Sequence, residues 1–272
     1  MRIRPIIFFM LALVITSCGE YEKLLKSTDY ELKRQKIFDY YDDGKYIRSI
    51  ELLSQILPRY RATDHAEQLN WINAQAHFRI RDYMMAGRFY QEFADTYPGS
   101  NNAEEASYLS ALCDYYQSPR PELDQANTRK AIESFTIFMQ RYPTSTHNDE
   151  CKAKTLELQE KLVEKSYLSA RLYYDLKEYR AATVSLANSL KEYPETKYRE
   201  ELMFLKLDAL YLLAVNSVPE KKVERYQTTL DEYYSFIEEY PQSKFTKDVN
   251  RIFESTTKYL KADPAVKQTE NN

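Results

Sequence analysis

The sequence predicts an all-α protein, an α-solenoid built from about five helix-turn-helix repeats. Three observations predict this fold class: a recurring Tyr-Pro pair, helical spacing of apolar residues before each pair, and only 4 glycines among 272 residues. Scarce glycine disfavours the many tight turns of an all-β chain. The glycines are also widely dispersed, which excludes a Gly-rich loop that cradles phosphate.

A tyrosine–proline pair occurs four times, and each pair closes a stretch with helical periodicity. The pairs are Tyr97-Pro98, Tyr142-Pro143, Tyr193-Pro194 and Tyr240-Pro241. The eighth residue before each proline is large and apolar, in chain order Tyr90, Phe135, Leu186 and Tyr233. The twelfth residue is small, in the same order Ala86, Ala131, Ala182 and Thr229. The large residues mark the buried stripe of a helix, the small ones let a neighbouring helix approach, and proline prevents the helix from continuing.

The region with helical periodicity covers residues 29–260 and divides into five units of two helices each. The first unit has a helix over about 29–42, then a turn, then a second helix that ends near Tyr60. The second unit starts near Ala66 and closes at the first Tyr-Pro pair. A tyrosine follows the turn in four of the units: Tyr46, Tyr83, Tyr179 and Tyr226.

The later units have connections of different lengths. Residues 118–125 separate the two helices of the third unit, and residues 218–220 separate those of the fifth. The fourth unit starts near Lys161 and closes at the third Tyr-Pro pair. Residues 261–272 are mostly polar, and we expect them to form a disordered tail.

The N-terminus has the features of an export signal. Arg2 and Arg4 precede an apolar run over residues 6–15, which is too short to span a bilayer comfortably. The tetrad Ile-Thr-Ser-Cys that ends at Cys18 resembles a bacterial lipobox, and this resemblance implies that Cys18 is lipidated after cleavage. We therefore expect a lipoprotein signal peptide over 1–17 and a lipidated tether over 18–28. The alternative is an ordinary signal peptide, or a core helix, that contains a cysteine by chance.

Motifs and composition give no support to an enzyme, so we expect no catalytic residues. The 3 histidines lack a second ligand at a spacing typical of a zinc site, and we expect no metal and no cofactor besides the lipid on Cys18. A net charge of -3 argues against nucleic acid as the main partner. For Cys113 and Cys151, two separate buried thiols are favoured, with one disulfide as the alternative.

The repeated spacing resembles the tetratricopeptide repeat (TPR). The second unit matches the family pattern at Ala74, Tyr83, Ala86, Tyr90 and Pro98. This resemblance implies a concave surface lined by the first helix of each repeat, which is a surface that binds peptides. It implies these candidate partner-binding residues: Phe38, Tyr41, Trp71, Gln75, Phe78, Tyr167, Arg171 and Tyr174. The alternative is that the aromatic residues among them pack between helices.

A lipobox followed by five degenerate TPRs resembles the BamD (YfiO) family. The most specific stretches are 122–145, with its Arg-Tyr-Pro-Thr-Ser end, and 160–196. The resemblance implies a lipid-anchored, non-enzymatic lipoprotein on the periplasmic side of the outer membrane. It also implies three kinds of partner: the POTRA region of BamA at the C-terminal repeats, unfolded β-barrel precursors at the N-terminal repeats, and other Bam subunits.

One residue departs from the better-known members of that family. Lys191 stands where they carry an arginine that contacts BamA, and lysine lacks the bidentate fork of arginine. Lys191 is nevertheless a candidate partner-binding residue. The alternative function is that of another TPR lipoprotein, an adaptor in cell-envelope maintenance or division.

Overall fold

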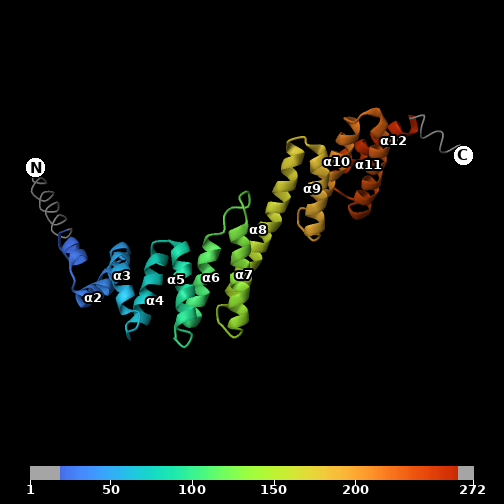
Figure 1. Ribbon diagram of the computed structural model, residues 1–272. Coiled ribbons are helices and arrows are strands. Elements are labelled where there is room, and N and C mark those ends of the chain that lie inside the picture. The colour runs from blue at the N-terminus through green and yellow to red at the C-terminus, as the bar shows by residue number, and fades with distance from the viewer. Residues whose placement is uncertain (1–18, 263–272) are drawn as a thin grey trace, which may run out of the picture. The chain divides into compact units, whose positions relative to one another are not determined.

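The computed structural model describes residues 19–262, and the regular structure within that range is helical (Figure 1). The expected signal peptide, Cys18 and residues 263–272 lie outside the described residues. The helices are α2 (Tyr30–Asp42), α3 (Tyr46–Tyr60), α4 (Ala66–Arg79), α5 (Tyr83–Thr96), α6 (Ala103–Tyr116), α7 (Ala126–Arg141), α8 (Asn148–Asp175), α9 (Tyr179–Glu192), α10 (Arg199–Val215), α11 (Pro219–Glu239) and α12 (Thr246–Ala262). The predicted all-α fold of TPR-like helix pairs is confirmed.

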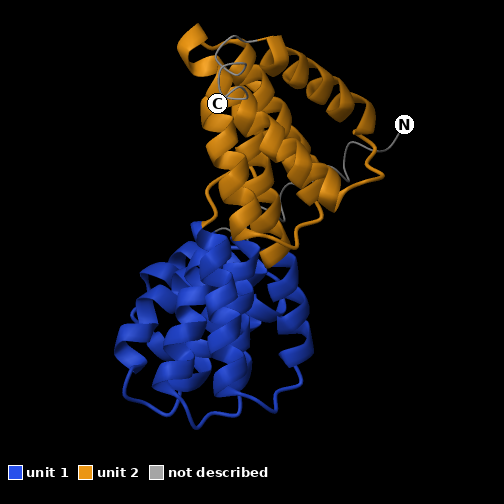
Figure 2. Cartoon of the chain, turned by 90° about the vertical axis from the view of Figure 1, so that its right-hand side faces the viewer, with its two compact units in different colours: residues 1–119, 126–158 blue, residues 120–125, 159–272 orange. Residues whose placement is uncertain are grey.

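The helices belong to two compact units (Figure 2). Of the described residues, unit 1 contains 19–119 together with 126–158, and unit 2 contains 120–125 together with 159–262. Within unit 1, each of the helices from α2 to α7 packs against the next, and within unit 2 the helices from α9 to α12 do the same. Helix α8 contributes its first part to unit 1 and its second part to unit 2.

Helix α8 is longer than the sequence predicts. We expected the fourth helix pair to start near Lys161, whereas α8 is a single helix of 28 residues that begins at Asn148. Within residues 148–158, only Cys151 and Leu158 are buried. An apolar stripe with so few members gives a weak helical period, so the start of this helix could not be located from the pattern.

The Tyr-Pro pairs end helices as predicted. Tyr97, Tyr193 and Tyr240 directly follow the last turns of α5, α9 and α11. The N–H group of each tyrosine donates a hydrogen bond to the carbonyl four residues earlier, and the next residue is the proline. Proline has no N–H group to continue this ladder, so the helix stops there.

The turn inside the helix pair has the same backbone conformation in three places. Gly44, Arg81 and Lys177 each lie two residues before the tyrosine that opens the next helix, and their φ angles are 72°, 62° and 61°. This left-handed region costs little for glycine and about 1–2 kcal/mol for residues with a Cβ atom. The three turns therefore have equivalent backbones, although only the first has glycine, the residue that adopts this conformation at least cost.

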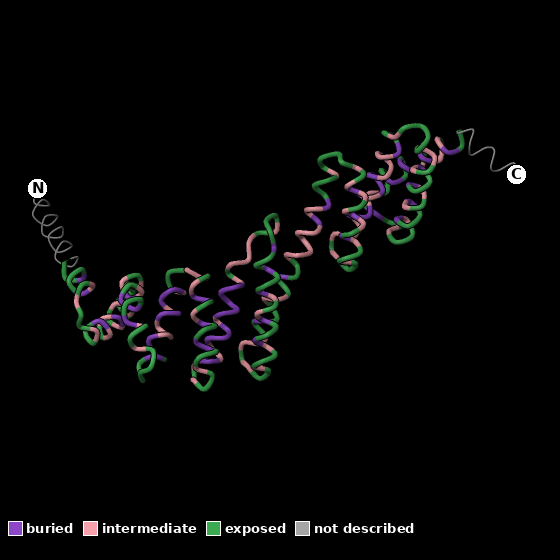
Figure 3. Tube along the Cα trace, in the orientation of Figure 1, coloured by how far each residue is buried: buried purple, intermediate pink, exposed green. Residues whose placement is uncertain are grey.

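Burial follows the helical stripes within each unit (Figure 3). The large residues that the Tyr-Pro spacing picked out are buried in the second helices: Tyr90, Phe135, Leu186 and Tyr233. Helix α12 follows the fifth helix pair and covers it, because Val249 and Ile252 pack with Phe236 of α11. Its opposite face is exposed, so α12 closes the end of unit 2.

A stacked aromatic pair joins successive repeats at three places. The rings of Tyr108 and His147 lie 3.9 Å apart, those of Tyr167 and Tyr198 4.1 Å apart, and those of Phe204 and Phe245 4.1 Å apart. The second member of each pair is the fourth residue after the proline of a Tyr-Pro pair. The segment after the proline thus returns to stack on the first helix of the preceding repeat, a contact that the helical periodicity did not indicate.

Residues 19–26 form a short helix that packs on the first repeat. Tyr21 and Leu24 are buried in a cluster with Ile37, Leu52 and Leu53 of α2 and α3. We expected a polar tether over 18–28. The part of it that the structure describes contains a packed helix.

Cys113 and Cys151 are both free and both buried. The favoured prediction of two separate buried thiols is confirmed. Within residues 19–262, no helix is both long enough and apolar enough to cross a membrane.

Candidate functional site

In unit 1, the first helices of the repeats bring several predicted residues together. The hydroxyl group of Tyr41 on α2 donates a hydrogen bond to Oε1 of Gln75 on α4, at 3.1 Å. A hydrogen bond from Arg79, one turn further along α4, also reaches Tyr41 and raises the pKa of the guanidinium. We call the surface formed by α2, α4 and α6 the first-helix face. It combines aromatic rings with amide and guanidinium groups, which is typical of protein-binding surfaces.

Trp71, Phe38 and Phe78 on this face are partly buried. The ring of Trp71 lies 5.7 Å from that of Tyr90 and 5.2 Å from that of Phe93, both on α5. Each of the three predicted residues thus packs between helices on one side and is accessible on the other. The packing alternative holds for the buried side of each ring, and binding through the accessible side stays a prediction.

An exposed tyrosine extends the first-helix face onto α6. Tyr116 is 46% exposed, and its ring stacks on that of Tyr83 with the centroids 4.6 Å apart. Phe78 contacts both rings, at 5.6 Å and 6.2 Å. Tyr116 was not among the predicted residues because the third repeat departs from the TPR spacing. The Tyr115-Tyr116 pair at the end of an expected helix was the signal that could have found it.

The neighbouring Tyr115 joins α6 to the first part of α8. Its hydroxyl group donates to both carboxylate oxygens of Glu157, at 2.9 and 2.8 Å, and the ammonium of Lys154 lies 4.2 Å from its ring centroid. Partial burial is the largest cause that raises the pKa of Tyr115 to about 12, and the hydrogen bond to Glu157 is the next largest. The hydroxyl group therefore remains a donor at neutral pH, and this end of the face keeps a fixed arrangement.

In unit 2, the predicted residues form a tyrosine–carboxylate network. Tyr167 is buried and donates to Oε1 of Glu201 at 2.8 Å, while Arg171 donates to the Tyr167 hydroxyl oxygen at 2.7 Å and to Glu201 at 3.1 Å. Tyr174 donates a short hydrogen bond to the carboxylate of Asp208. Tyr167 offers little accessible surface, so the accessible groups here are Arg171 and the edge of Tyr174.

Lys191 lies apart from this network, in a groove of unit 2. The groove has a volume of about 600 Å³ and lies between α9 and α11, with α10 as its floor. Two ion pairs line it: Arg199 with Glu239 at 2.5 Å, and Lys206 with Glu232 at 2.5 Å. Among residues 19–262, no carboxylate oxygen lies within 4.0 Å of the Lys191 ammonium, so this charge is available to a partner.

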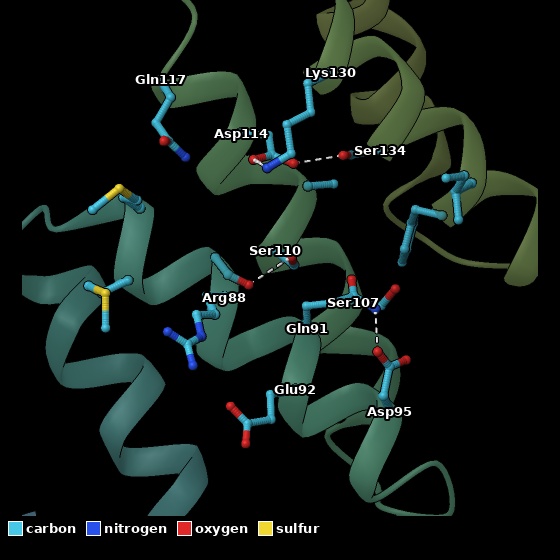
Figure 4. Close-up of a pocket in the computed structure, with 16 residues that line it drawn as sticks. Arg88, Gln91, Glu92, Asp95, Ser107, Ser110, Asp114, Gln117, Lys130 and Ser134 are labelled. Atoms are coloured by element: carbon cyan, nitrogen blue, oxygen red, sulfur yellow. Dashed lines mark hydrogen bonds and ion pairs between the residues drawn. The ribbon is translucent and has the colours of Figure 1, made fainter. Parts of the chain in front are cut away.

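A groove of about 700 Å³ lies at the equivalent place in unit 1, between α5 and α7 (Figure 4). Asp114 of the α6 floor is buried and accepts hydrogen bonds from Lys130 at 2.8 Å and Ser134 at 2.7 Å. Ser110 donates to the carbonyl oxygen of Gly87 at 3.0 Å. These hydrogen bonds satisfy the Asp114 carboxylate at the floor of the groove and join α5, α6 and α7. No motif in the sequence indicated this groove.

Within residues 19–262, no group of three or more His, Cys, Asp or Glu side chains could hold a metal ion. His77 packs against Phe89, with the rings 5.0 Å apart, and its Nδ1 atom lies 3.0 Å from Asp82. His147 is used in the stack with Tyr108. Both histidines therefore have a structural role.

The profile of the YfiO family, described as "Outer membrane lipoprotein", matches residues 34–226, which include most of both units. The chain belongs to this family. Relatives with the name "Outer membrane protein assembly factor BamD" are similar to it over long alignments. The protein of Pasteurella multocida is 21% identical over 77% of this chain and 84% of its own length. The protein of Haemophilus influenzae is 19% identical over 87% of this chain and 94% of its own length.

A third relative, the BamD protein of Caulobacter vibrioides, is 22% identical over 178 residues. That alignment covers 65% of this chain and 58% of the relative, so it leaves a substantial part of the relative unmatched. The resemblance that the sequence motifs indicated is confirmed at the level of the YfiO family, and the TPR-like fold agrees with it.

Proposed function

We propose that this chain is a non-enzymatic, lipid-anchored subunit of the outer-membrane β-barrel assembly (Bam) complex. The observation that carries the proposal is the match to the YfiO family over residues 34–226, together with relatives named as outer membrane protein assembly factors. The lipobox-like tetrad ending at Cys18 supports anchoring to the periplasmic side of the outer membrane. Buried CH₂ groups of acyl chains contribute about 0.8 kcal/mol each, so the several chains on such a cysteine hold a protein stably.

The first-helix face of unit 1 receives unfolded β-barrel precursors. Tyr41, Gln75, Phe78 and Tyr116 give it accessible aromatic rings beside an amide group. An unfolded barrel strand alternates apolar and polar side chains, so its aromatic residues can pack on these rings while its backbone bonds to polar side chains. Trp71 contributes its accessible edge to the same contact.

Unit 2 binds the POTRA region of BamA. Lys191 on the rim of its groove has an unpaired charge, and Arg171 lies in a network that leaves part of its guanidinium exposed. Such rim charges steer association and give specificity more than affinity. The contact therefore requires a complementary acidic patch on the partner.

Peptide binding tests the role of the first-helix face. A peptide with the C-terminal strand of a barrel precursor, ending in an aromatic residue, is titrated into the protein, and the fluorescence of Trp71 reports binding. Tyr116→Ala should weaken binding at least fivefold, because an anchoring aromatic residue contributes more than about 1 kcal/mol. Tyr234→Ala is the matched control: Tyr234 is 51% exposed and lies in unit 2, so this change should leave binding as it is in the parent.

Equal peptide affinity for the parent and Tyr116→Ala would remove the first-helix face from the proposal. Anchoring is tested separately by Cys18→Ala. This variant should leave the membrane fraction or accumulate as an unprocessed precursor, and its retention as a mature membrane protein would contradict lipidation.

A further inference from the structure

The short helix over residues 19–26 is held against the first repeat by contacts at both of its ends. Near its start, the ring of Tyr21 meets that of Tyr40 edge-on, with the centroids 5.5 Å apart. The Arg48 guanidinium lies over both rings, 4.7 Å from Tyr21 and 5.7 Å from Tyr40. The Tyr21 hydroxyl group bonds to the Glu51 carboxylate. Burial is the largest cause that raises the pKa of Tyr21 above its ordinary value, and the hydrogen bond to Glu51 is the next largest. The hydroxyl group therefore remains a donor.

The end of the short helix is held by a buried lysine. Lys33 on α2 is only 3% exposed, and its ammonium donates to the carbonyl oxygen of Leu25 at 3.0 Å and to Oε1 of Gln55 at 2.5 Å. A cation at the carbonyl end of a helix is favourable, and a buried ammonium needs such partners. Without the short helix, the Lys33 ammonium would lose the Leu25 carbonyl as an acceptor.

These contacts also fix which end of the first repeat lies beside residue 19. Glu20 lines a shallow hollow together with Asp42, Asp43 and Lys45, the residues of the α2–α3 turn. Leu25, at the other end of the short helix, lies at Lys33 in the first turn of α2. Residue 19 therefore lies at the end of the repeat where α2 meets α3, and away from the end where α3 meets α4.

We propose that the helix over 19–26 is a clasp that fixes the lipid anchor to unit 1 and holds the α2–α3 turn against the phospholipid headgroups. This inference rests on the lipidation of Cys18 in the proposed function. The clasp begins at Gly19, the residue directly after Cys18 in the sequence, so a lipid on Cys18 would be joined to the folded body without a linker. A flexible segment over 19–28 would instead reach up to about 35 Å. Lys45 is ion-paired with Asp43 at 2.8 Å, so the exposed side chain of Lys23 is the group that this end of the repeat offers to lipid phosphate.

A fluorescent probe at either end of α3 tests the clasp in the full-length, lipidated protein. Asp42→Cys places the probe at the α2–α3 turn, and Arg61→Cys places it just beyond α3, a helix of 15 residues. Such a helix is about 22 Å long, so the two probes lie at clearly different heights if the clasp holds. Both positions are exposed, while Cys113 and Cys151 are buried and should remain unlabelled.

In phospholipid vesicles with a quencher attached to the lipid headgroup, the probe at position 42 should be quenched at least threefold more than the probe at position 61. In the double variant Tyr21→Ala, Leu24→Ala the two probes should be quenched equally, because the anchor is then flexible. Trp71 fluorescence checks that unit 1 remains folded in this variant. Equal quenching in the parent, or an undiminished difference in the double variant, would overturn the clasp.

Hydrogen exchange of the lipidated parent gives a second test that needs no variant. Amides of residues 23–26, which bond to carbonyls within the short helix, should exchange at least tenfold more slowly than those of an unstructured peptide. Exchange at the unstructured rate would overturn the clasp. Lipidation is read independently from the mass of the mature protein. A parent without the lipid mass would overturn both the anchor and the clasp, whereas a lipidated parent with equal quenching would overturn the clasp alone.

Discussion

The hydroxyl group of Tyr41 donates a hydrogen bond at 3.1 Å to Oε1 of Gln75, 34 residues later in the chain. Tyr174 in unit 2 has the same place in its helix pair, and it donates to Asp208, also 34 residues later. Each of these tyrosines also meets edge-on the tyrosine that follows the turn, Tyr46 in one case and Tyr179 in the other. The two units thus repeat one device that joins successive first helices.

Tyr41→Phe keeps the ring and removes the hydrogen bond to Gln75 together with the one from Arg79. The free energy of unfolding of unit 1 should fall by at least about 0.5 kcal/mol, because a partly buried hydrogen bond contributes about 0.5–1.5 kcal/mol. Urea unfolding followed by the fluorescence of Trp71, the only tryptophan, reports unit 1 alone. Gln75→Ala should cost a similar amount, and the double variant should cost less than the sum. Strict additivity would contradict a direct contact.

Gly87→Ala should destabilise unit 1 although alanine favours helices more than glycine does. A Cβ atom at this position would lie 3.0 Å from Cβ of Cys113, so α5 and α6 would have to separate. Overpacking of this kind costs about 1–3 kcal/mol, which exceeds the gain of about 1 kcal/mol in helix propensity. Gly99→Ala is the control, since nothing lies within 4 Å of the added atom. A more stable Gly87→Ala protein in the same urea assay would show that the helices are not in close contact there.

The thiols of Cys113 and Cys151 should be inert in the folded protein. Burial raises the pKa of Cys113 to about 12 and that of Cys151 to about 11, so the reactive thiolate is scarce at pH 8. Alkylation with iodoacetamide, followed by mass spectrometry, should modify neither residue in buffer and both in concentrated urea. Rapid labelling of either thiol in buffer would mean that its helix opens readily.

Asp208 should make unit 2 less stable as the pH rises. Burial raises the pKa of this carboxyl group, against the lowering effects of the Tyr174 hydrogen bond and of Arg251 on α12. A carboxyl group with a raised folded pKa contributes stability that is complete below the unfolded value of about 3.9 and is lost as the pH rises through the folded value. Asp208→Asn should therefore slow hydrogen exchange of α10 at pH 7, and this advantage should shrink towards pH 4.

The control for this titration is Asp231→Asn, because Asp231 is exposed on α11 of the same unit. It should leave exchange in α10 unchanged at both pH values. An Asp208→Asn protein that exchanges faster than the parent at pH 7 would mean that the charged carboxylate stabilises unit 2.

The ends of the second helices could be predicted from the sequence because they depend on local chemistry. Proline after Tyr97, Tyr193 or Tyr240 removes a backbone donor wherever it occurs, so the helix stops irrespective of tertiary contacts. The start of α8 depends on packing instead. Few residues of its first part are buried. What stabilises that part is the packing of Phe135 and Phe138 of α7 against Cys151 and Leu158, which the pattern of the sequence does not show.

The candidate binding residues were predictable only as positions on a helix face. The TPR spacing placed Tyr41 and Gln75 on neighbouring first helices, and the structure brings them into contact. The burial of Tyr167 could not be foreseen, because it depends on Tyr198 returning from the segment after a Tyr-Pro pair to stack on its ring. The position of Tyr116 and the packing of the clasp over 19–26 also depend on contacts between separate helices. The periodicity of one helix does not reveal such contacts.

Co-purification from the outer membrane tests the central claim most directly, namely that this YfiO-family chain acts as a subunit of the β-barrel assembly complex. The full-length, lipidated protein with an affinity tag after residue 272 is isolated from detergent-solubilised outer membranes, and its partners are identified by mass spectrometry. We predict that BamA is recovered with the parent, and that Lys191→Glu reduces its yield severalfold. Recovery of other envelope proteins without BamA, from membranes that contain both, would contradict the claim.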